Sequence, residues 1–217
     1  MEKLTFKQLT RDTLYFRLGL KQHRKHILLD QWLDLSKEQT VDEFEEKQLT
    51  RLQNTLLLRA SSWNEFELSE WFIGPLLSMI EFNSEEISMF AFREITAVVN
   101  DIELTGRPDV MIAKGIDDPQ VPYFCFHEYK RQTDPDGNPQ TQLLGAMLAA
   151  QTLNNNQKPI CGIYVIGYDW VFVVLNGSEW CESNPYTATD DDELFDIYKI
   201  LKVLKKIILK NTETPKL

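Results

Sequence analysis

The sequence contains little cysteine, no long apolar segment and no secretory leader. Its three cysteines, Cys125, Cys161 and Cys181, are odd in number and far apart in apolar or strand-like segments. This spacing argues against a disulfide framework and a structural zinc site, and it suits a reducing compartment. Charged or polar residues interrupt every apolar segment before it is long enough to cross a bilayer, and the N-terminal residues lack a signal-peptide cleavage site. We therefore expect a cytoplasmic protein that does not contact a membrane.

Positive charge is also scarce. The chain of 217 residues has 23 lysines and arginines against 33 aspartates and glutamates, which gives a net charge of -10. Such a chain has no overall field that attracts nucleic acid. An enzyme acting on nucleic acid would therefore depend on a local site and on metal ions that offset the charge of the phosphate. The apolar fraction of 43% is ordinary for a globular domain.

The chain has no internal repeat, no low-complexity stretch and no Gly/Ser/Pro-rich linker. The first eighty residues contain few helix breakers and repeat apolar residues at helical spacing, which predicts three or four helices. One of them spans Glu65 to Ile80, where Asn64 and Glu67 form a capping-box pattern. We expect residues 1–62 to be a helical extension packed on a core formed by residues 63–217.

After Asn83 the residue pattern changes from helical to alternating. Aromatic and β-branched segments predict strands, and turn residues separate them. The expected elements are strands at 90–99, up to Gly115, at 121–130, at 161–170 and at 171–177, with helices at 140–153 and 193–210. This order predicts an α/β (α+β) fold with a central mixed sheet of about five strands flanked by helices.

The strand that ends in His-Glu-Tyr-Lys carries charge where burial is expected. Residues two apart share one face of a strand, so Glu128 and Lys130 are expected on the face of Phe124 and Phe126, with His127 on the other. A buried carboxylate and a buried ammonium are costly unless they meet each other, a metal or a substrate. The alternative is a cross-strand ion pair on an edge strand, which stabilises a protein little.

Asp109 opens the apolar segment that precedes this strand. If the two strands are neighbours, Asp109 and Glu128 bring two carboxylates together, and the backbone carbonyl of Tyr129 lies between the charged positions. Hard oxygen ligands of this kind suit Mg²⁺ or Mn²⁺. Lys130 would then lower the pKa of an attacking water or stabilise the negative charge of a phosphoryl transition state. Taken by itself, Asp109 is better explained as a turn residue that caps a strand end.

Pro108-Asp109 followed by Glu128-Tyr129-Lys130 resembles the PD-(D/E)xK signature of the restriction-endonuclease-like nuclease superfamily. The expected order of elements is similar to the core of that superfamily. The segments NEFELSEWFIGPLL and GIYVIGYDWVFVVLNG resemble the N-terminal nuclease domain of type I restriction-enzyme motor subunits. The resemblance covers roughly residues 64–180.

The resemblance implies a restriction-endonuclease-like core and magnesium-dependent hydrolysis of phosphodiester bonds in DNA, in restriction, defence or repair. It also implies a supporting role for Gln142 at the start of the following helix. Glu67 best matches the family's metal-side glutamate, ahead of Glu70 and Glu65. A protein partner or a homodimer is compatible with this class of enzyme.

Several alternatives remain open from the sequence. Glu67 already has a structural explanation as a capping residue, and Gln142 is slightly better explained as an ordinary polar residue at a helix N-terminus than as a residue that orients a water or contacts phosphate. Trp63 and Trp71 are better explained by packing than by base stacking. The fold as a whole is also compatible with a non-catalytic binding module, or with a nuclease subunit that is active only with a partner.

Overall fold

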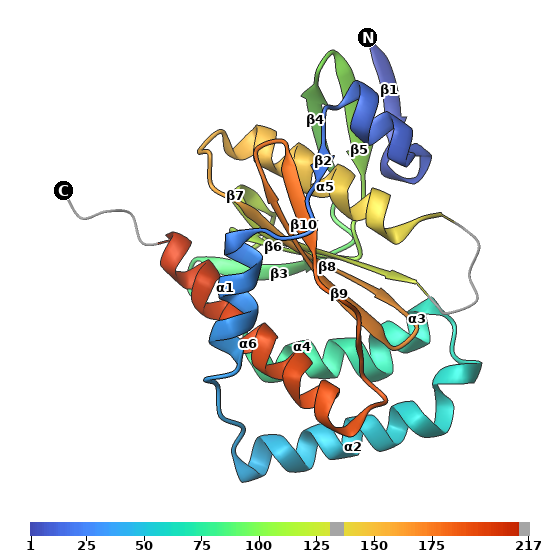
Figure 1. The fold of residues 1–217 in the computed structure, drawn as a ribbon, viewed down its shortest axis with the longest axis vertical. Coiled ribbons are helices and arrows are strands. Elements are labelled where there is room, and N and C mark those ends of the chain that lie inside the picture. The colour runs from blue at the N-terminus through green and yellow to red at the C-terminus, as the bar shows by residue number, and fades with distance from the viewer. Residues whose placement is uncertain (131–136, 213–217) are drawn as a thin grey trace, which may run out of the picture.

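The computed structural model describes residues 1–130 and 137–212, and it has an α+β architecture built on a large mixed sheet (Figure 1). The strand order of this sheet is β2-β10-β9-β8-β7-β6-β3, with β11 paired to β9. The strands are β2 (Lys21–Gln22), β3 (Ile87–Ala91), β6 (Val110–Lys114), β7 (Gln120–Lys130), β8 (Ile160–Ile166), β9 (Asp169–Asn176), β10 (Glu179–Glu182) and β11 (Tyr186–Thr187). The sheet is larger than the five strands expected, because short strands extend its edges.

A second sheet of three strands stands beside the first, in the order β1-β5-β4. The single strand expected at 90–99 is therefore wrong. Phe92 has a positive φ of 53°, which ends β3, and the chain leaves the large sheet to form β4 (Ile95–Val99) and β5 (Ile102–Gly106). Asn100 and Asp101 join these two strands with φ values of 48° and 62°, as a two-residue hairpin turn requires.

The first 62 residues are not the wholly helical extension expected from the sequence. They include β1 (Glu2–Thr5), which pairs in parallel with β5, and β2, which pairs in parallel with β10. Residues 1–62 are therefore part of both sheets. Their helical elements are a 3-10 turn (Phe6–Gln8), a π turn (Thr13–Arg17), α1 (Ile27–Ser36), α2 (Glu43–Arg59) and a 3-10 turn (Ala60–Ser62).

Helices cover one face of the large sheet with a shared hydrophobic core. The expected helix from Glu65 to Ile80 is confirmed, as α3 (Glu65–Leu68), a π turn (Ser69–Ile73) and α4 (Gly74–Ile80). With α1, α2 and α6 (Asp191–Thr212), it packs around Trp32, Phe72 and Trp170. Among the described residues, no helix is both long enough and apolar enough to span a membrane.

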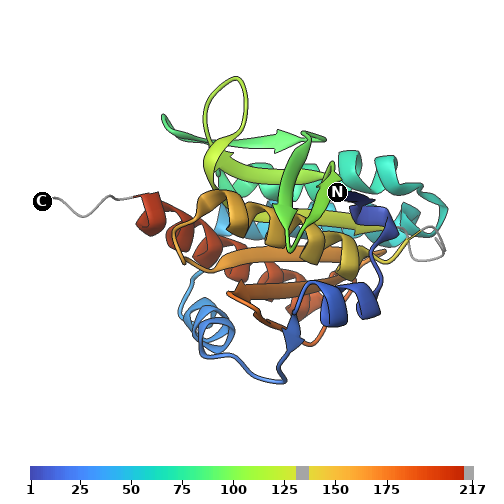
Figure 2. The same cartoon turned by 90° about the horizontal axis from the view of Figure 1, so that it is seen from above.

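The opposite face of the large sheet is covered by α5 (Pro139–Asn154), on which the small sheet also packs (Figure 2). Phe6 lies between two glycines of this layer. A Cβ atom added at Gly106 would lie 2.3 Å from Phe6 Cδ2, and one added at Gly145 would lie 3.0 Å from Phe6 Cδ1. Both positions therefore need glycine for the N-terminal segment to fit against α5.

Strand β7 shows two register shifts against β6, and the first of them changes which residues share a face. Ile112 of β6 pairs with Cys125, but the next residue, Ala113, pairs with Tyr123, so Phe124 is an extra residue in β7. Phe124 packs in the core of the α1, α2, α4 and α6 face, whereas Phe126 packs in the core under α5. The expectation that Phe124 shares the face of Glu128 is therefore wrong.

Candidate active site

Strand β7 lies inside the large sheet, between β6 and β8, and ends with the charged residues predicted for the site. Asp109 comes directly before β6, whose first pair joins Val110 to His127. The side chains are buried, with relative exposures of 7% for Asp109, 5% for Glu128 and 5% for Lys130. The fold thus brings the three residues to one end of two neighbouring strands.

Asp109 is attached to the backbone of β7. Its Oδ2 atom accepts a hydrogen bond of 2.6 Å from the backbone N–H of Tyr129. Extending the register of β6 and β7 by two pairs would place Asp109 opposite Glu128 and then Pro108 opposite Tyr129. Proline has no N–H to donate. The Tyr129 carbonyl points to the same side as its N–H, so it lacks a ladder donor at this position and is available as a ligand beside Asp109.

Lys130 lies between two carboxylates. Its Nζ atom is 3.2 Å from Glu128 Oε1 and 3.2 Å from both carboxylate oxygens of Glu65. Glu65 is the first residue of α3, which lies beside the end of β7 (Figure 1). The Glu65 side chain is 36% exposed, against 6% for Lys130, so the buried charges are open to solvent on the Glu65 side.

The carboxyl groups have pKa values displaced upwards. Burial raises the pKa of Glu128 to about 8, and the neighbouring charge of Asp109 adds to the effect. Burial likewise raises the pKa of Asp109 to about 6, against the lowering effects of the Tyr129 hydrogen bond and of Lys130. Burial alone would lower the pKa of Lys130, but Glu128, Glu65 and Asp109 together raise it. The site therefore holds excess negative charge that burial disfavours.

Glu65, rather than Glu67, is the helix glutamate that reaches the site. The Glu67 carboxylate accepts a hydrogen bond of 2.8 Å from the Asn64 backbone N–H, and Asn64 Oδ1 accepts one of 2.9 Å from the Glu67 N–H. This is the capping box that the sequence offered as the structural alternative. Because the box occupies Glu67, the sequence already contained a signal in favour of Glu65.

A small cavity opens next to the carboxylates. Its volume is about 190 Å³, and Glu65, Asp109 and Tyr129 form part of its lining. The rim is apolar, because Phe66 and Phe92 also line the cavity and are 67% and 56% exposed. A ligand can therefore approach Asp109 and Glu65 from solvent, between two exposed aromatic rings.

Gln142 lies in the first turn of α5 and is 3% exposed. Its Nε2 atom has no hydrogen-bond partner within the described ranges. A Cβ atom added at Gly137, where φ is +95°, would lie 2.6 Å from this Nε2. Within the same ranges, no hydrogen bond connects Gln142 to Asp109, Glu128 or Lys130, so its supporting role stays a prediction.

The other face of β7 carries a neutral polar pair. The Tyr129 hydroxyl and His127 Nδ1 are 3.0 Å apart, and the two residues are 1% and 0% exposed. Burial lowers the pKa of His127 to about 3, so the imidazole is uncharged at neutral pH. His127 is the hydrogen-bonded structural histidine expected from its place on the strand.

The donor set is compatible with Mg²⁺ or Mn²⁺. Across residues 1–130 and 137–212, no three His, Cys, Asp or Glu side chains gather closely enough to hold a metal by themselves. A magnesium site does not require three, because Mg²⁺ is commonly held by one or two carboxylates and keeps several waters. Asp109, Glu128 and the Tyr129 carbonyl supply two carboxylates and one carbonyl at a place where negative charge is in excess.

The sequence matches no protein-family model and no curated protein. The site is therefore defined by its own geometry. Its four charged groups are Glu65, Asp109, Glu128 and Lys130, and they lie at one end of the sheet beside an open cavity.

Proposed function

We propose that the protein is a metal-dependent nuclease of the PD-(D/E)xK type that hydrolyses phosphodiester bonds in DNA. The observation that carries the proposal is the buried Lys130 ammonium, held between Glu128 and Glu65 beside a second buried carboxylate, Asp109. Such charges are costly to bury. In a nuclease these buried charges would be functional, because the reaction needs both a cation site and a fixed positive charge.

In this proposal Asp109, Glu128 and the Tyr129 carbonyl hold Mg²⁺ or Mn²⁺. The metal would supply activation of a water molecule and neutralisation of phosphate charge. Asp109 is kept in place by the Tyr129 N–H, so the carboxylate and the carbonyl are oriented by the same residue. Glu65 either contributes to the metal site through water or orients Lys130.

Lys130 has the role of a fixed positive charge. The neighbouring carboxylates raise its pKa against the effect of burial, so it stays protonated at neutral pH and does not serve as a general base. An ammonium group has three donors, and Glu128 and Glu65 occupy two directions. The remaining donor would stabilise the charge that develops on the phosphate.

The proposal places the enzyme in the cytoplasm. All three cysteines are free and buried, which suits a reducing compartment. A nuclease that needs a protein partner is the second candidate. The exposed Phe66 and Phe92 at the rim of the site favour it, because a partner or a second copy would cover them.

The test is a cleavage assay on supercoiled, linear and single-stranded DNA and on RNA, with Mg²⁺ or Mn²⁺ and an EDTA control. The parent protein should cut DNA only with metal, and Asp109→Asn should not cut. A folded Asp109→Asn protein that still cuts would exclude this site. A folded parent that cuts no substrate would move the assignment to the partner-dependent enzyme or to a non-catalytic module.

A further inference from the structure

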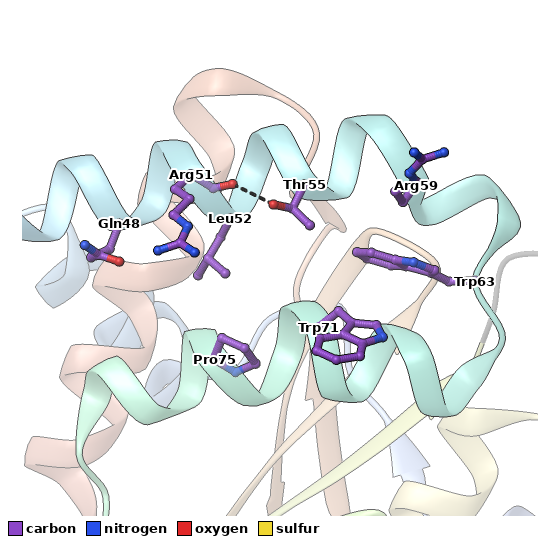
Figure 3. A pocket seen from close by; sticks show the side chains of 8 residues that line it. All are labelled: Gln48, Arg51, Leu52, Thr55, Arg59, Trp63, Trp71 and Pro75. Carbon is purple, nitrogen blue, oxygen red and sulfur yellow. Dashed lines mark hydrogen bonds between the residues drawn. The ribbon is translucent and has the colours of Figure 1, made fainter.

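A second cavity lies on the outer side of the helix that carries Glu65. It has a volume of about 600 Å³ and runs between α2 and the helical segment of α3 and α4 (Figure 3). None of the eight side chains that line it is acidic, although the chain as a whole has a net charge of -10. We call this region the Arg-Trp cleft.

One wall of the Arg-Trp cleft is basic. Arg51, Thr55 and Arg59 follow one another at four-residue intervals along α2, so they share one stripe of the helix. The arginines are separated by about 12 Å along the helix axis. Figure 3 shows Arg51 extending into the gap toward Pro75, and Arg59 directed away from it. In the part of the chain that the structure describes, acidic side chains pair with Arg17, Arg93 and Arg107 but not with these two arginines.

The other end of the Arg-Trp cleft is aromatic. Trp63 and Trp71 lie near each other there (Figure 3). Trp71 is 56% exposed, so its expected role in packing is wrong, whereas Trp63 is half-buried and packs partly on the core. Of the aromatic pairs among described residues, none joins these two indoles. The two indole rings therefore do not stack on each other.

Unpaired arginines beside exposed indoles suit a polyanion that carries flat apolar groups. Phosphates bind guanidinium groups by charge-assisted, bidentate hydrogen bonds, and nucleobases stack on tryptophan without regard to sequence. Bases in a duplex are already stacked on each other and are not free to do this. The ligand that fits both walls is therefore a single strand.

We infer that the Arg-Trp cleft binds a single-stranded segment of nucleic acid. Arg51, which extends into the cleft, contacts a phosphate, Arg59 adds positive charge at its edge, and Trp63 and Trp71 stack bases. Trp63 lies two residues before Glu65, whose carboxylate contacts Lys130, so a strand in the cleft passes the start of α3 next to the candidate active site. This inference rests on the proposed function for what happens to the bound strand, namely cleavage. It names single-stranded nucleic acid as the substrate class of the nuclease.

The test measures binding without cleavage. In EDTA, a fluorescein-labelled oligothymidine, an oligouridine of equal length and a duplex are titrated with the protein, and anisotropy is followed. We expect single strands to bind more tightly than the duplex and to quench the emission of the two accessible indoles, since Trp32, Trp170 and Trp180 are buried. Binding should weaken with salt: in a plot of the logarithm of the association constant against the logarithm of the salt concentration, the slope should fall by about 0.7 for each phosphate contacted.

Matched variants assign the binding to the cleft. Trp71→Leu keeps an apolar side chain of useful bulk but loses the stacking face, and should weaken binding about 5- to 150-fold, whereas Trp71→Phe should restore most of it. Arg51→Gln should lower the salt slope. Phe44→Ala, at an exposed position of the same helix α2, and Lys37→Gln, at an exposed lysine paired with Asp34, should change neither quantity.

The outcomes separate the inference from the proposed nuclease. Loss of binding in Trp71→Leu supports the cleft even if the parent protein never cuts. Equal binding by Trp71→Leu and the parent, or tighter binding of the duplex, overturns the cleft even if Asp109 proves essential for cleavage. A parent dimer that Trp71→Leu converts to a monomer, with oligonucleotide binding unchanged, also overturns it, because the cleft is then a protein interface.

Discussion

Strand β7 carries buried polar groups on both faces, and the two faces handle burial in opposite ways. His127 and Tyr129 form a neutral pair joined by one hydrogen bond, and burial keeps the histidine uncharged. Glu128 and Lys130, on the face of Phe126, contact each other, and Lys130 also contacts Glu65. The same strand thus contains a pair that burial keeps neutral and a group of charges that opposite charge compensates only in part.

The difference lies in what each face still lacks. The neutral pair lacks only a partner for His127 Nε2 among the described residues, whereas three carboxylates share a single ammonium at the end of β7. Burial of that excess negative charge favours binding of a cation or of protons. A structural core avoids this situation, so the charged face is the one where a ligand is expected. The following predictions test that contrast.

The largest effect is expected from Lys130→Met, which keeps the length of the side chain and removes its charge. Cleavage should fall about 100- to 1,000-fold, because a fixed charge beside the reacting phosphate is lost. Lys114→Met, at an exposed lysine paired with Glu86, is the matched control and should cut normally. Full activity of a folded Lys130→Met protein would contradict the role given to this residue.

The pH dependence of stability should distinguish the charged face. The folded-state pKa of Glu128 is raised to about 8 from 4.5. Between these pH values the native state therefore binds the Glu128 proton more firmly than the unfolded state does. Its stabilising contribution is complete below pH 4.5 and is lost as the pH rises through 8. Metal-free parent protein should therefore lose up to about 1.4 kcal/mol per pH unit relative to Glu128→Gln. Denaturant unfolding from pH 5 to pH 8.5 measures this, and parallel curves would refute it.

On the neutral face, Tyr129→Phe should affect stability and not catalysis. The variant leaves His127 Nδ1 without its partner in a fully buried position, which costs about 1–3 kcal/mol. The backbone N–H that holds Asp109 is unchanged, so cleavage at a temperature where the variant is folded should match the parent. A large fall in cleavage would show that the two faces are coupled.

Metal should stabilise the charged face directly. At ten times the dissociation constant, Mg²⁺ or Mn²⁺ should raise the free energy of unfolding by about 1.4 kcal/mol. The gain should be larger at pH 8 than at pH 5.5, because protons compete for Asp109 and Glu128, whose pKa values are about 6 and 8. Thermal melts with Asp109→Asn as the control measure it. An equal shift in both proteins would place the metal elsewhere.

The smallest effect is expected at the start of α3, where two glutamates have different partners. Glu67→Ala removes a capping contact and should cost about 1 kcal/mol or less, with cleavage unchanged. Glu65→Ala removes the partner of Lys130 and should lower cleavage. Comparing the two variants in melts and in the cleavage assay tests the assignment, and the reverse pattern would restore Glu67 to the site.

Local patterns in the sequence predicted those parts of the fold that depend on local geometry. The helix from Glu65 to Ile80 follows from its spacing and cap, and the hairpin of β8 and β9 follows from two apolar segments around Gly167. The turn after Val99 was expected, but the excursion into β4 and β5 was missed, because the breaks at Phe92 and after Gly106 interrupt the β-rich segments only briefly.

For the site, the two-residue period of a strand was sufficient to place Glu128 and Lys130 together. The same period predicted the wrong face for Phe124, because the bulge there is set by pairing with β6 and leaves no clear local pattern in the sequence. Glu65 could not be chosen with certainty, since its contact with Lys130 depends on how α3 enters beside β7. Long-range register and helix entry are tertiary properties, and one sequence does not reveal them.

The pairing of β1 with β5 has a consequence for the order of events during synthesis. Glu2 pairs with Ile102, so about a hundred residues must emerge from the ribosome before the first strand meets its neighbour. The packing of Phe6 is completed even later, because one of its two glycine contacts, Gly145, lies in α5. β1 and Phe6 are thus made long before the residues they pack against, and they can be fixed only after β5 and α5 have been made.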